Sequence, residues 1–236
     1  MRIAGRSDRC AIAIMAKAPR RGEVKTRLVP PLSESDAAAL SRCFIQDIAG
    51  NILAAAREAP IDGYVAYSPA GSEDVFARLL PEGIGLLPPR RIGLGHSLYD
   101  AAEDLLAAGY GAACLVNADS PTLPTSALVA AAHALAPPGD RLILGPAEDG
   151  GYYLIGLKHP HRRLFEEIAW STERVFRQTL ERAAEIGLDT VTLRSWYDVD
   201  DVASLRRLMG ELGTPDRAGY AAPHTAAFLR RLAPRL

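Results

Sequence analysis

Residues 10–28 read CAIAIMAKAPRRGEVKTRL, an apolar run followed by a basic loop. The run Cys10–Ala16 is short and entirely apolar, as expected for a parallel strand that is buried on both faces. It leads directly into a loop with five basic residues in eleven positions, where Pro19 and Gly22 shape the turn. The stretch therefore predicts an α/β sheet whose strands end in ligand-binding loops.

Strand-like and helix-like runs alternate along the rest of the chain. Further strands are predicted at 61–68, 83–87, 112–117, 141–145, 152–157 and 190–193. Helices are predicted at 33–57, 72–80, 97–108, 125–135, 172–186 and 202–212. This order indicates a mostly parallel central sheet with helices on both faces. We expect one domain over residues 1–213, followed by an Arg- and Pro-containing tail, 214–236, with a short helix near 225–232.

The composition narrows the class of protein. The formal net charge of −1 disfavours a general nucleic-acid binder, which would be clearly basic. Cys10, Cys43 and Cys114 are widely spaced, as expected in a reducing compartment. No apolar run approaches the ~18 residues of a membrane span, and no signal-peptide core follows the N-terminus. We therefore expect a cytoplasmic protein; its oligomeric state is not indicated.

The basic loop after the first strand is the first candidate site. Its backbone N–H groups can surround a polyphosphate, which Lys25 and Arg27 can neutralise. It contains neither GxxxxGK[ST] nor GxGxxG, and the alternative is a solvated basic turn. The predicted nucleotide-binding residues of this loop are Lys17, Ala18, Pro19, Gly22, Lys25 and Arg27.

Two further segments place acids directly after predicted strands. Asn117 and Asp119 lie at the tip of the strand 112–117, where Asp119 can anchor a hard cation and Asn117 can contact the nucleotide. The alternatives for Asp119 are an Asx-turn or a helix N-cap. In WYDVDD, extended backbone places Asp198 and Asp200 on one face, so either can complete the metal site. One acid of this run is enough to cap the next helix.

The segment GPAEDGGYY, residues 145–153, is the remaining candidate. Glu148 or Asp149 can hold a hydroxyl or act as a base, and Gly150 and Gly151 permit close approach of a ligand. The competing interpretation is an Asp-Gly hairpin turn. Trp170 is either a substrate-stacking residue or an aromatic at the rim of the core.

Five motifs occur in a recognisable order. They are MAKAPRRGEVKTRL, NADSPTLP, LGPAEDGGYYLIGL, WSTERV and WYDVDDVASL. In this order the chain resembles a family of bacterial GT-A-like transferases labelled as glycosyltransferases of arsenosugar biosynthesis. The layout is also similar to 2-phospho-L-lactate guanylyltransferase and to molybdenum-cofactor nucleotidylyltransferases.

The resemblance implies a single GT-A, or nucleotide-diphospho-sugar transferase, domain. It implies that Lys25 and Arg27 contact nucleotide phosphates, and that Asp119 holds Mg²⁺ or Mn²⁺ with Asp198 or Asp200. One departure concerns the metal site, because Asn117 stands two residues upstream of Asp119 and a DxD motif is lacking.

Three functions remain open from the sequence. The first is glycosyl transfer from a nucleotide-diphospho-sugar to a small-molecule acceptor. Its catalytic acids would be Glu148, Asp149 and Asp200, and its acceptor pocket Gly150, Gly151, Tyr152 and Trp170. The second is nucleotidylyl transfer, which joins an NTP to a phosphorylated small molecule with release of pyrophosphate. The third is a nucleotide-binding module without catalysis.

Overall fold

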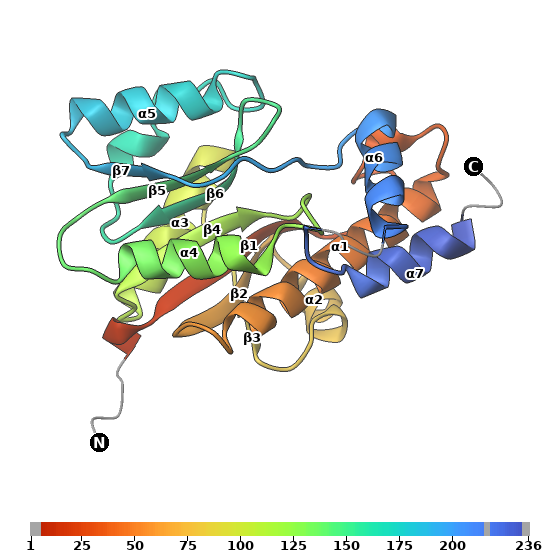
Figure 1. Cartoon of the computed structure of the whole chain (residues 1–236), viewed down its shortest axis with the longest axis horizontal. Coiled ribbons are helices and arrows are strands. Elements are labelled where there is room, and N and C mark those ends of the chain that lie inside the picture. The colour runs from red at the N-terminus through yellow and green to blue at the C-terminus, as the bar shows by residue number, and fades with distance from the viewer. Residues whose placement is uncertain (1–5, 215–217, 233–236) are drawn as a thin grey trace.

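The structure is a computed structural model that describes residues 6–214 and 218–232 (Figure 1). The strands are β1 (Cys10–Lys17), β2 (Ile61–Ser68), β3 (Ile84–Leu87), β4 (Ala112–Asn117), β5 (Leu142–Pro146), β6 (Tyr152–Leu157) and β7 (Thr190–Thr192). The α-helices are α1 (Glu34–Ala55), α2 (Glu73–Leu79), α3 (Leu94–Ala107), α4 (Thr125–Leu135), α5 (Val175–Glu185), α6 (Val202–Leu212) and α7 (Pro223–Leu232). Short 3-10 helices are η1 (Arg6–Asp8), η2 (Thr26–Leu28) and η3 (Arg162–Phe165).

The strands form one sheet in the order β3-β2-β1-β4-β6-β5-β7. Neighbouring strands are parallel except at β6, which runs antiparallel to both β4 and β5. The predicted mostly parallel sheet is thus confirmed. Because β5 and β6 are antiparallel neighbours, the segment between them is a hairpin turn, as the competing interpretation of residues 145–153 held.

The side chains of β1 pack against helices on both faces of the sheet. Ile12 and Ile14 pack in a core cluster with α1 and α4 on one face, whereas Ala11 and Ala13 pack with α3 on the other. The side chains of a strand alternate between faces, so one strand serves both layers. In Figure 1, α1 and α4 lie in front of the sheet and α3 behind it, which confirms the predicted cover on both faces.

A third core cluster joins the C-terminal helices to the loop that follows β1. It combines Leu28 and Leu32 with Tyr197, Val199 and residues of α1, α6 and α7. Asp47 of α1 accepts hydrogen bonds from the backbone N–H groups of His224 (2.9 Å) and Thr225 (2.8 Å), at the start of α7. Of the predicted tail, residues 215–217 and 233–236 lie outside the described residues, and a domain boundary after residue 213 stays a prediction.

Some helix boundaries differ from the prediction. Helix α3 begins at Leu94, three residues before the expected start. Helix α5 begins at Val175 and not at Thr172, because the Thr172 hydroxyl donates to the carbonyl of Ala169 and accepts from the N–H of Arg174 in a preceding turn.

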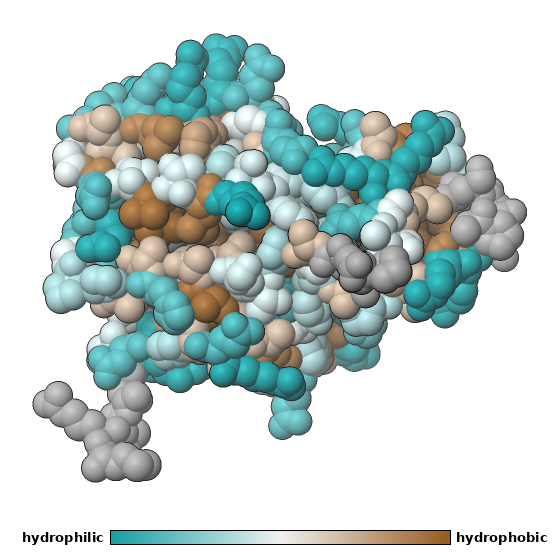
Figure 2. Space-filling view, viewed as in Figure 1, coloured by the Kyte–Doolittle hydropathy of each residue, from teal (hydrophilic) through white to brown (hydrophobic). Residues whose placement is uncertain are grey.

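Hydrophilic side chains cover the outer side of α5 at the top of Figure 2, opposite the face that packs on the sheet. Among the described residues, no helix has the length and apolar character to cross a bilayer.

Candidate functional site

A cleft of about 740 Å³, here called the main cleft, opens at the carboxyl ends of β1 and β4. This volume lies within the roughly 300–1,000 Å³ of small-molecule sites. All four segments that the sequence singled out contribute to its walls. The predicted site residues that line it are Lys17, Lys25, Arg27, Asn117, Asp119, Asp149, Gly151, Tyr152, Trp170 and Asp200.

Lys25 is the residue that connects these segments. Its side chain is only 5% exposed, and Nζ lies 2.5 Å from Oδ1 of Asp119 and 2.8 Å from Oδ1 of Asp200. Nζ also donates to the carbonyl of Val199 (2.8 Å) and lies 5.3 Å from the ring centroid of Phe44. Burial alone would lower the pKa of Lys25, but the two carboxylates outweigh it and the pKa is raised. The ammonium group is therefore charged and held in place.

The backbone reinforces this connection. The N–H of Val199 donates to the carbonyl of Asp119 (2.9 Å), so the 198–200 segment lies directly against the tip of β4. Asp201 is the N-cap of α6, in a capping box with Ser204. The capping role thus falls to Asp201, and Asp198 and Asp200 are left for other contacts.

The surroundings of Asp119 do not match its two alternative roles, an Asx-turn and a helix N-cap. Helix α4 has Pro124 as its N-cap, so Asp119 caps no helix there. The side chain that turns back on the backbone is that of Asn117, whose Oδ1 accepts from the N–H of Asp119 (3.4 Å). The carboxylate of Asp119 is 38% exposed and faces Lys25 in the main cleft.

Negative charge accumulates beside this contact. Burial raises the pKa of Asp198, and the neighbouring carboxylates of Asp149, Asp200 and Asp119 raise it further, to about 6. Asp198 lines a second cavity of about 400 Å³, here called the side cavity. The side cavity and the main cleft share Arg27, Asp149 and Asp200, which form the wall between them.

The predicted metal site at Asp119, Asp198 and Asp200 is not assembled. Across residues 6–214 and 218–232, no group of three or more His, Cys, Asp or Glu side chains is arranged to hold a metal ion. The ammonium group of Lys25 contacts both Asp119 and Asp200, so a metal ion would compete with it for these carboxylates. The donor set nevertheless fits a hard cation in kind, since it consists of carboxylate oxygens and carries surplus negative charge.

The two acids of the hairpin turn have different partners. Glu148 forms two hydrogen bonds with Arg207 (2.5 and 3.0 Å), which lower its pKa, and it lines the side cavity. Arg207 also lies 3.8 Å from the ring centroid of Tyr197. Asp149 accepts a hydrogen bond from the N–H of Gly151 (2.8 Å) and faces both cavities. Arg207 was not among the predicted site residues.

Four predicted site residues line neither the main cleft nor the side cavity. Gly150 has a φ of +90°, and a Cβ atom there would lie 2.3 Å from the carbonyl oxygen of Glu173, so its close approach is to the protein's own backbone. Ala18 and Pro19 are buried, and Gly22 is an exposed turn residue with a φ of +74°. These residues shape the loops that carry the site.

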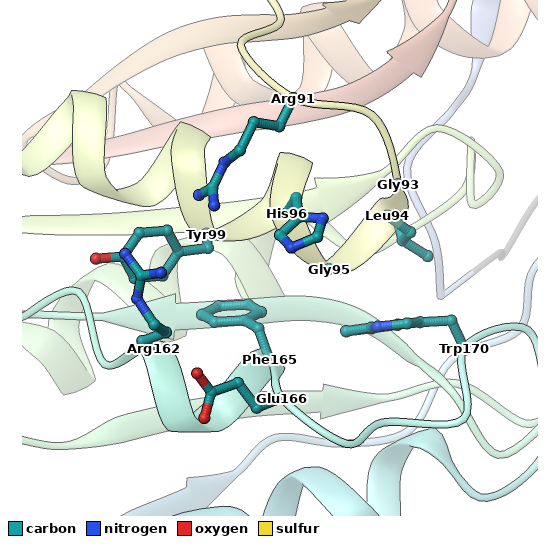
Figure 3. A pocket seen from close by; sticks show the side chains of 10 residues that line it. All are labelled: Arg91, Gly93, Leu94, Gly95, His96, Tyr99, Arg162, Phe165, Glu166 and Trp170. Atoms are coloured by element: carbon teal, nitrogen blue, oxygen red, sulfur yellow. The ribbon is translucent and has the colours of Figure 1, made fainter.

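Sequence reasoning missed a further pocket of about 200 Å³ beside the main cleft (Figure 3). Arg91 and Tyr99 line it from α3 and the preceding loop, and Arg162 and Phe165 line it from η3. These elements are far apart in the sequence, and neither carries a motif. Trp170, predicted as a stacking residue, lines both this pocket and the main cleft.

Residues 51–172 match a family described as "uncharacterized protein conserved in bacteria (DUF2064)". No curated protein matches the sequence. A crystal structure of a candidate nucleotide-diphospho-sugar transferase from Desulfovibrio desulfuricans G20 is 28% identical, with a TM-score of 0.82 over 96% of both chains.

Two more distant structures share the fold. A cytidylyltransferase from Leptospira borgpetersenii serovar Hardjo-bovis is 11% identical, with a TM-score of 0.55 over 96% of both chains. The 4-diphosphocytidyl-2C-methyl-D-erythritol synthase of Anaerococcus prevotii is 10% identical, with a TM-score of 0.54 over 88% of this chain and all of the other. The fold is therefore that of the nucleotide-diphospho-sugar transferases, as the resemblance implied.

Proposed function

We propose that this chain, which belongs to the bacterial DUF2064 family and has the nucleotide-diphospho-sugar transferase fold, is a transferase acting on an activated nucleotide. The reaction best supported is glycosyl transfer from a nucleotide-diphospho-sugar to a small-molecule acceptor. The main support for this proposal is that Lys25 contacts both Asp119 and Asp200 on the wall of the main cleft.

The basic loop forms the phosphate side of the proposed site. Lys17 is half exposed at the cleft, and Arg27 forms no ion pair within the described part of the chain. Arg27 is free to neutralise a diphosphate through charge-assisted hydrogen bonds, whereas Lys17 would do so by exchanging its exposed contact with Glu23 (3.7 Å) for the phosphate. Lys25 adds a charge whose position is fixed before the nucleotide arrives.

Asp119 and Asp200, with Asp198 beside them, are the residues that would hold a divalent ion. They would supply carboxylate oxygens to Mg²⁺ or Mn²⁺, whose positive charge would stabilise the leaving diphosphate. Because Lys25 contacts both carboxylates, it also keeps them together in the absence of an ion.

The acceptor hydroxyl needs a base, and Asp149 fits this role best among the three predicted acids. Glu148 is held by Arg207, and Asp200 is held by Lys25. Asp149 faces the main cleft, forms no ion pair among the described residues, and has one carboxylate oxygen turned to the N–H of Gly151. A carboxylate placed in this way can accept the proton as the hydroxyl attacks.

The distribution of charge favours glycosyl transfer over nucleotidylyl transfer. In nucleotidylyl transfer the attacking group is itself a phosphate, which needs no base. Asp149 and Asp200 lie on the wall between the main cleft and the side cavity, and Asp198, which lines the side cavity, adds to their negative charge, which would repel that phosphate. A neutral hydroxyl meets no such barrier.

Nucleotidylyl transfer is supported by a different observation. Asn117, and not an acid, stands two residues upstream of Asp119. A single strand-tip aspartate, with Lys25 and Arg27 neutralising charge that develops on the α-phosphate, suits attack on an NTP.

One assay separates the two reactions. The protein is incubated with Mg²⁺ or Mn²⁺ and panels of NTPs and nucleotide-diphospho-sugars, and the release of pyrophosphate and of nucleoside diphosphate is followed. We expect slow release of nucleoside diphosphate from one nucleotide-sugar. Pyrophosphate release that depends on a phosphorylated acceptor would establish nucleotidylyl transfer instead, and nucleotide binding without release in any panel would indicate a binding module.

A further inference from the structure

The pocket of about 200 Å³, here called the α3–η3 pocket, adjoins the main cleft. Leu94 and Trp170 line both spaces. Sites that hold a whole small molecule have volumes of roughly 300–1,000 Å³, so this pocket fits one part of a ligand whose remainder lies in the main cleft.

Flat apolar surfaces form much of the pocket. Phe165 packs edge-to-face against Tyr99, with ring centroids 6.0 Å apart, and Trp170 packs in the same way against Tyr152 at 6.5 Å. Figure 3 shows Phe165 and Trp170 along one side, facing the first turn of α3. Leu94 is 47% exposed at the junction with the cleft. Such walls suit a ring, which stacks on aromatic faces.

Gly95 sets the position of Trp170. A Cβ atom at residue 95 would lie 2.7 Å from Nε1 of Trp170. Only glycine therefore lets the indole pack against the first turn of α3, so the partition between pocket and cleft is built into the fold.

Hydrogen-bond donors outnumber acceptors among the polar side chains of the pocket. Arg162 lies with Cζ 4.9 Å from the ring centroid of Tyr99 and forms no ion pair among the described residues. His96 turns Nδ1 toward the carbonyl of Ile92 (3.2 Å), which leaves Nε2 available. The one acid, Glu166, is 3.7 Å from Arg163. A ligand group that accepts hydrogen bonds and carries negative charge complements this set.

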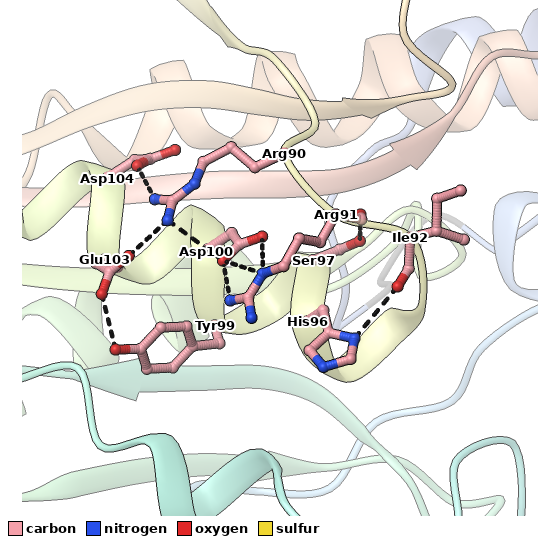
Figure 4. A network of polar contacts seen from close by, with 9 residues as sticks. All are labelled: Arg90, Arg91, Ile92, His96, Ser97, Tyr99, Asp100, Glu103 and Asp104. Carbon is pink, nitrogen blue, oxygen red and sulfur yellow. Dashed lines mark hydrogen bonds and ion pairs between the residues drawn. The ribbon is translucent and has the colours of Figure 1, made fainter.

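A network on α3 fixes the opposite wall before any ligand binds (Figure 4). Nε of Arg91 donates to both carboxylate oxygens of Asp100 (2.9 and 3.0 Å), whose side chain is 4% exposed. Arg90 contacts two acids, with Nη2 donating to Glu103 (2.8 Å) and Nη1 to Asp104 (2.5 Å). The charge of Arg91 is thus compensated by Asp100, and Arg162 remains the uncompensated guanidinium of the pocket.

We propose that the α3–η3 pocket binds the acceptor substrate, and that this acceptor contains a ring bearing a carboxylate or a phosphate. The ring lies against Phe165 and Trp170, and its anionic group is directed to Arg162. The acceptor then extends past Trp170 and Tyr152, so that its hydroxyl, at the end remote from the anion, reaches Asp149. The identification as acceptor rests on the proposed transferase function, whereas anion binding in the pocket can be measured without turnover.

Trp170 itself provides the measurement. The chain has two tryptophans, so Trp196→Phe leaves Trp170 as the single indole fluorophore. In this background, phenyl phosphate, benzoate and the neutral phenyl β-glucoside are titrated separately. We expect saturable changes in Trp170 emission with phenyl phosphate or benzoate and about tenfold weaker binding of the neutral probe. The comparison of the two anions shows which oxyanion the pocket prefers.

Arg162→Gln tests the assigned contact, with Arg163→Gln as its matched control. Arg163 is the next residue of η3 but pairs with Glu185 (2.8 Å) and Glu167 (2.8 Å), and more distantly with the pocket's Glu166 (3.7 Å). We expect Arg162→Gln to weaken binding of the anionic probe about tenfold and Arg163→Gln to weaken it by no more than about twofold, with nucleotide affinity unaltered in both.

Three outcomes would overturn the inference. The first is equal affinity for neutral and anionic probes, and the second is the absence of a saturable response. The third is a loss of nucleotide affinity in Arg162→Gln that matches the loss of probe affinity. That result would assign the pocket to the nucleotide. If probes fail while a nucleotide-sugar still binds and is cleaved, this inference fails and the transferase function stands. If probes bind but no nucleotide does, anion binding in the pocket stands and the transferase function fails.

Discussion

Nζ of Lys25 lies 2.5 Å from Oδ1 of Asp119, so the loop after β1 and the tip of β4 meet through a nearly buried ammonium group. The same ammonium contacts Asp200, which comes from a segment more than eighty residues further along the chain. Three separate parts of the sequence therefore depend on one side chain for their relative position.

Replacing Lys25 by Met should weaken both binding and stability. The substitution keeps the length of the side chain but leaves Asp119 and Asp200 without their common partner. Because both carboxylates are more than a third exposed and can recover water, we expect the free energy of unfolding to fall by about 1–2 kcal/mol, less than for a fully buried pair. Urea unfolding measures this, and Lys17→Met, at a half-exposed lysine of the same loop, should change it by less than about 0.5 kcal/mol.

Asp149→Asn should separate chemistry from nucleotide binding. Loss of the general base is expected to lower kcat with an acceptor by a factor of about 10²–10⁴, whereas the affinity for the nucleotide-sugar should be retained. Glu148→Gln is the neighbouring control, because Glu148 is engaged by Arg207 and lines the side cavity. Equal losses of kcat in the two variants would show that Asp149 has no special role.

Gly150→Ala should disturb the wall of the main cleft. The added Cβ would lie 2.3 Å from the carbonyl oxygen of Glu173, at a backbone φ of +90° that L-residues rarely adopt. We expect a destabilisation of about 1–3 kcal/mol. Gly210→Ala, in α6 with nothing near the added methyl, should instead stabilise by up to about 1 kcal/mol. Thermal unfolding of both variants shows whether steric approach or the loss of glycine itself matters.

Acid should remove the stabilising contribution of Asp62. Hydrogen bonds from Arg9 and Tyr110 hold the pKa of Asp62 below its ordinary value. The unfolded chain then binds more protons than the folded one, so this contribution is present above pH ~4 and is lost as the pH falls through the folded pKa. The urea midpoint at pH 6 and at pH 3 should therefore differ less in Asp62→Asn than in the unchanged protein. An identical pH dependence in the two proteins would exclude the contribution.

The strands were predictable because each is a short apolar run with clear ends. Residues 61–68 and 112–117 were placed without error, since Gly, Pro or charged residues bound them. The helix starts were less accurate, and the turn around Thr172 shows why: its hydroxyl satisfies backbone groups as a helix cap would, but outside the helix.

The side chains that meet in the site could be anticipated only in part. Because the segments of Lys25, Asp119 and Asp200 follow predicted strands, the sequence predicts that these residues lie at one edge of the sheet. It did not show that the ammonium group would stand between the two carboxylates, because that depends on the left-handed backbone of Lys25 and on the packing around Phe44. No local pattern in the sequence predicts the α3–η3 pocket.

Isothermal titration of nucleotide into Asp119→Asn, with Mg²⁺ or Mn²⁺ present, measures whether Asp119 anchors a metal ion at the nucleotide. Asp201→Asn is the matched control, since Asp201 caps α6 and asparagine caps almost equally well. We expect Asp119→Asn to abolish the metal-dependent part of nucleotide binding and Asp201→Asn to leave it unchanged. Metal-dependent affinity that is the same in Asp119→Asn as in the unchanged protein would contradict this expectation.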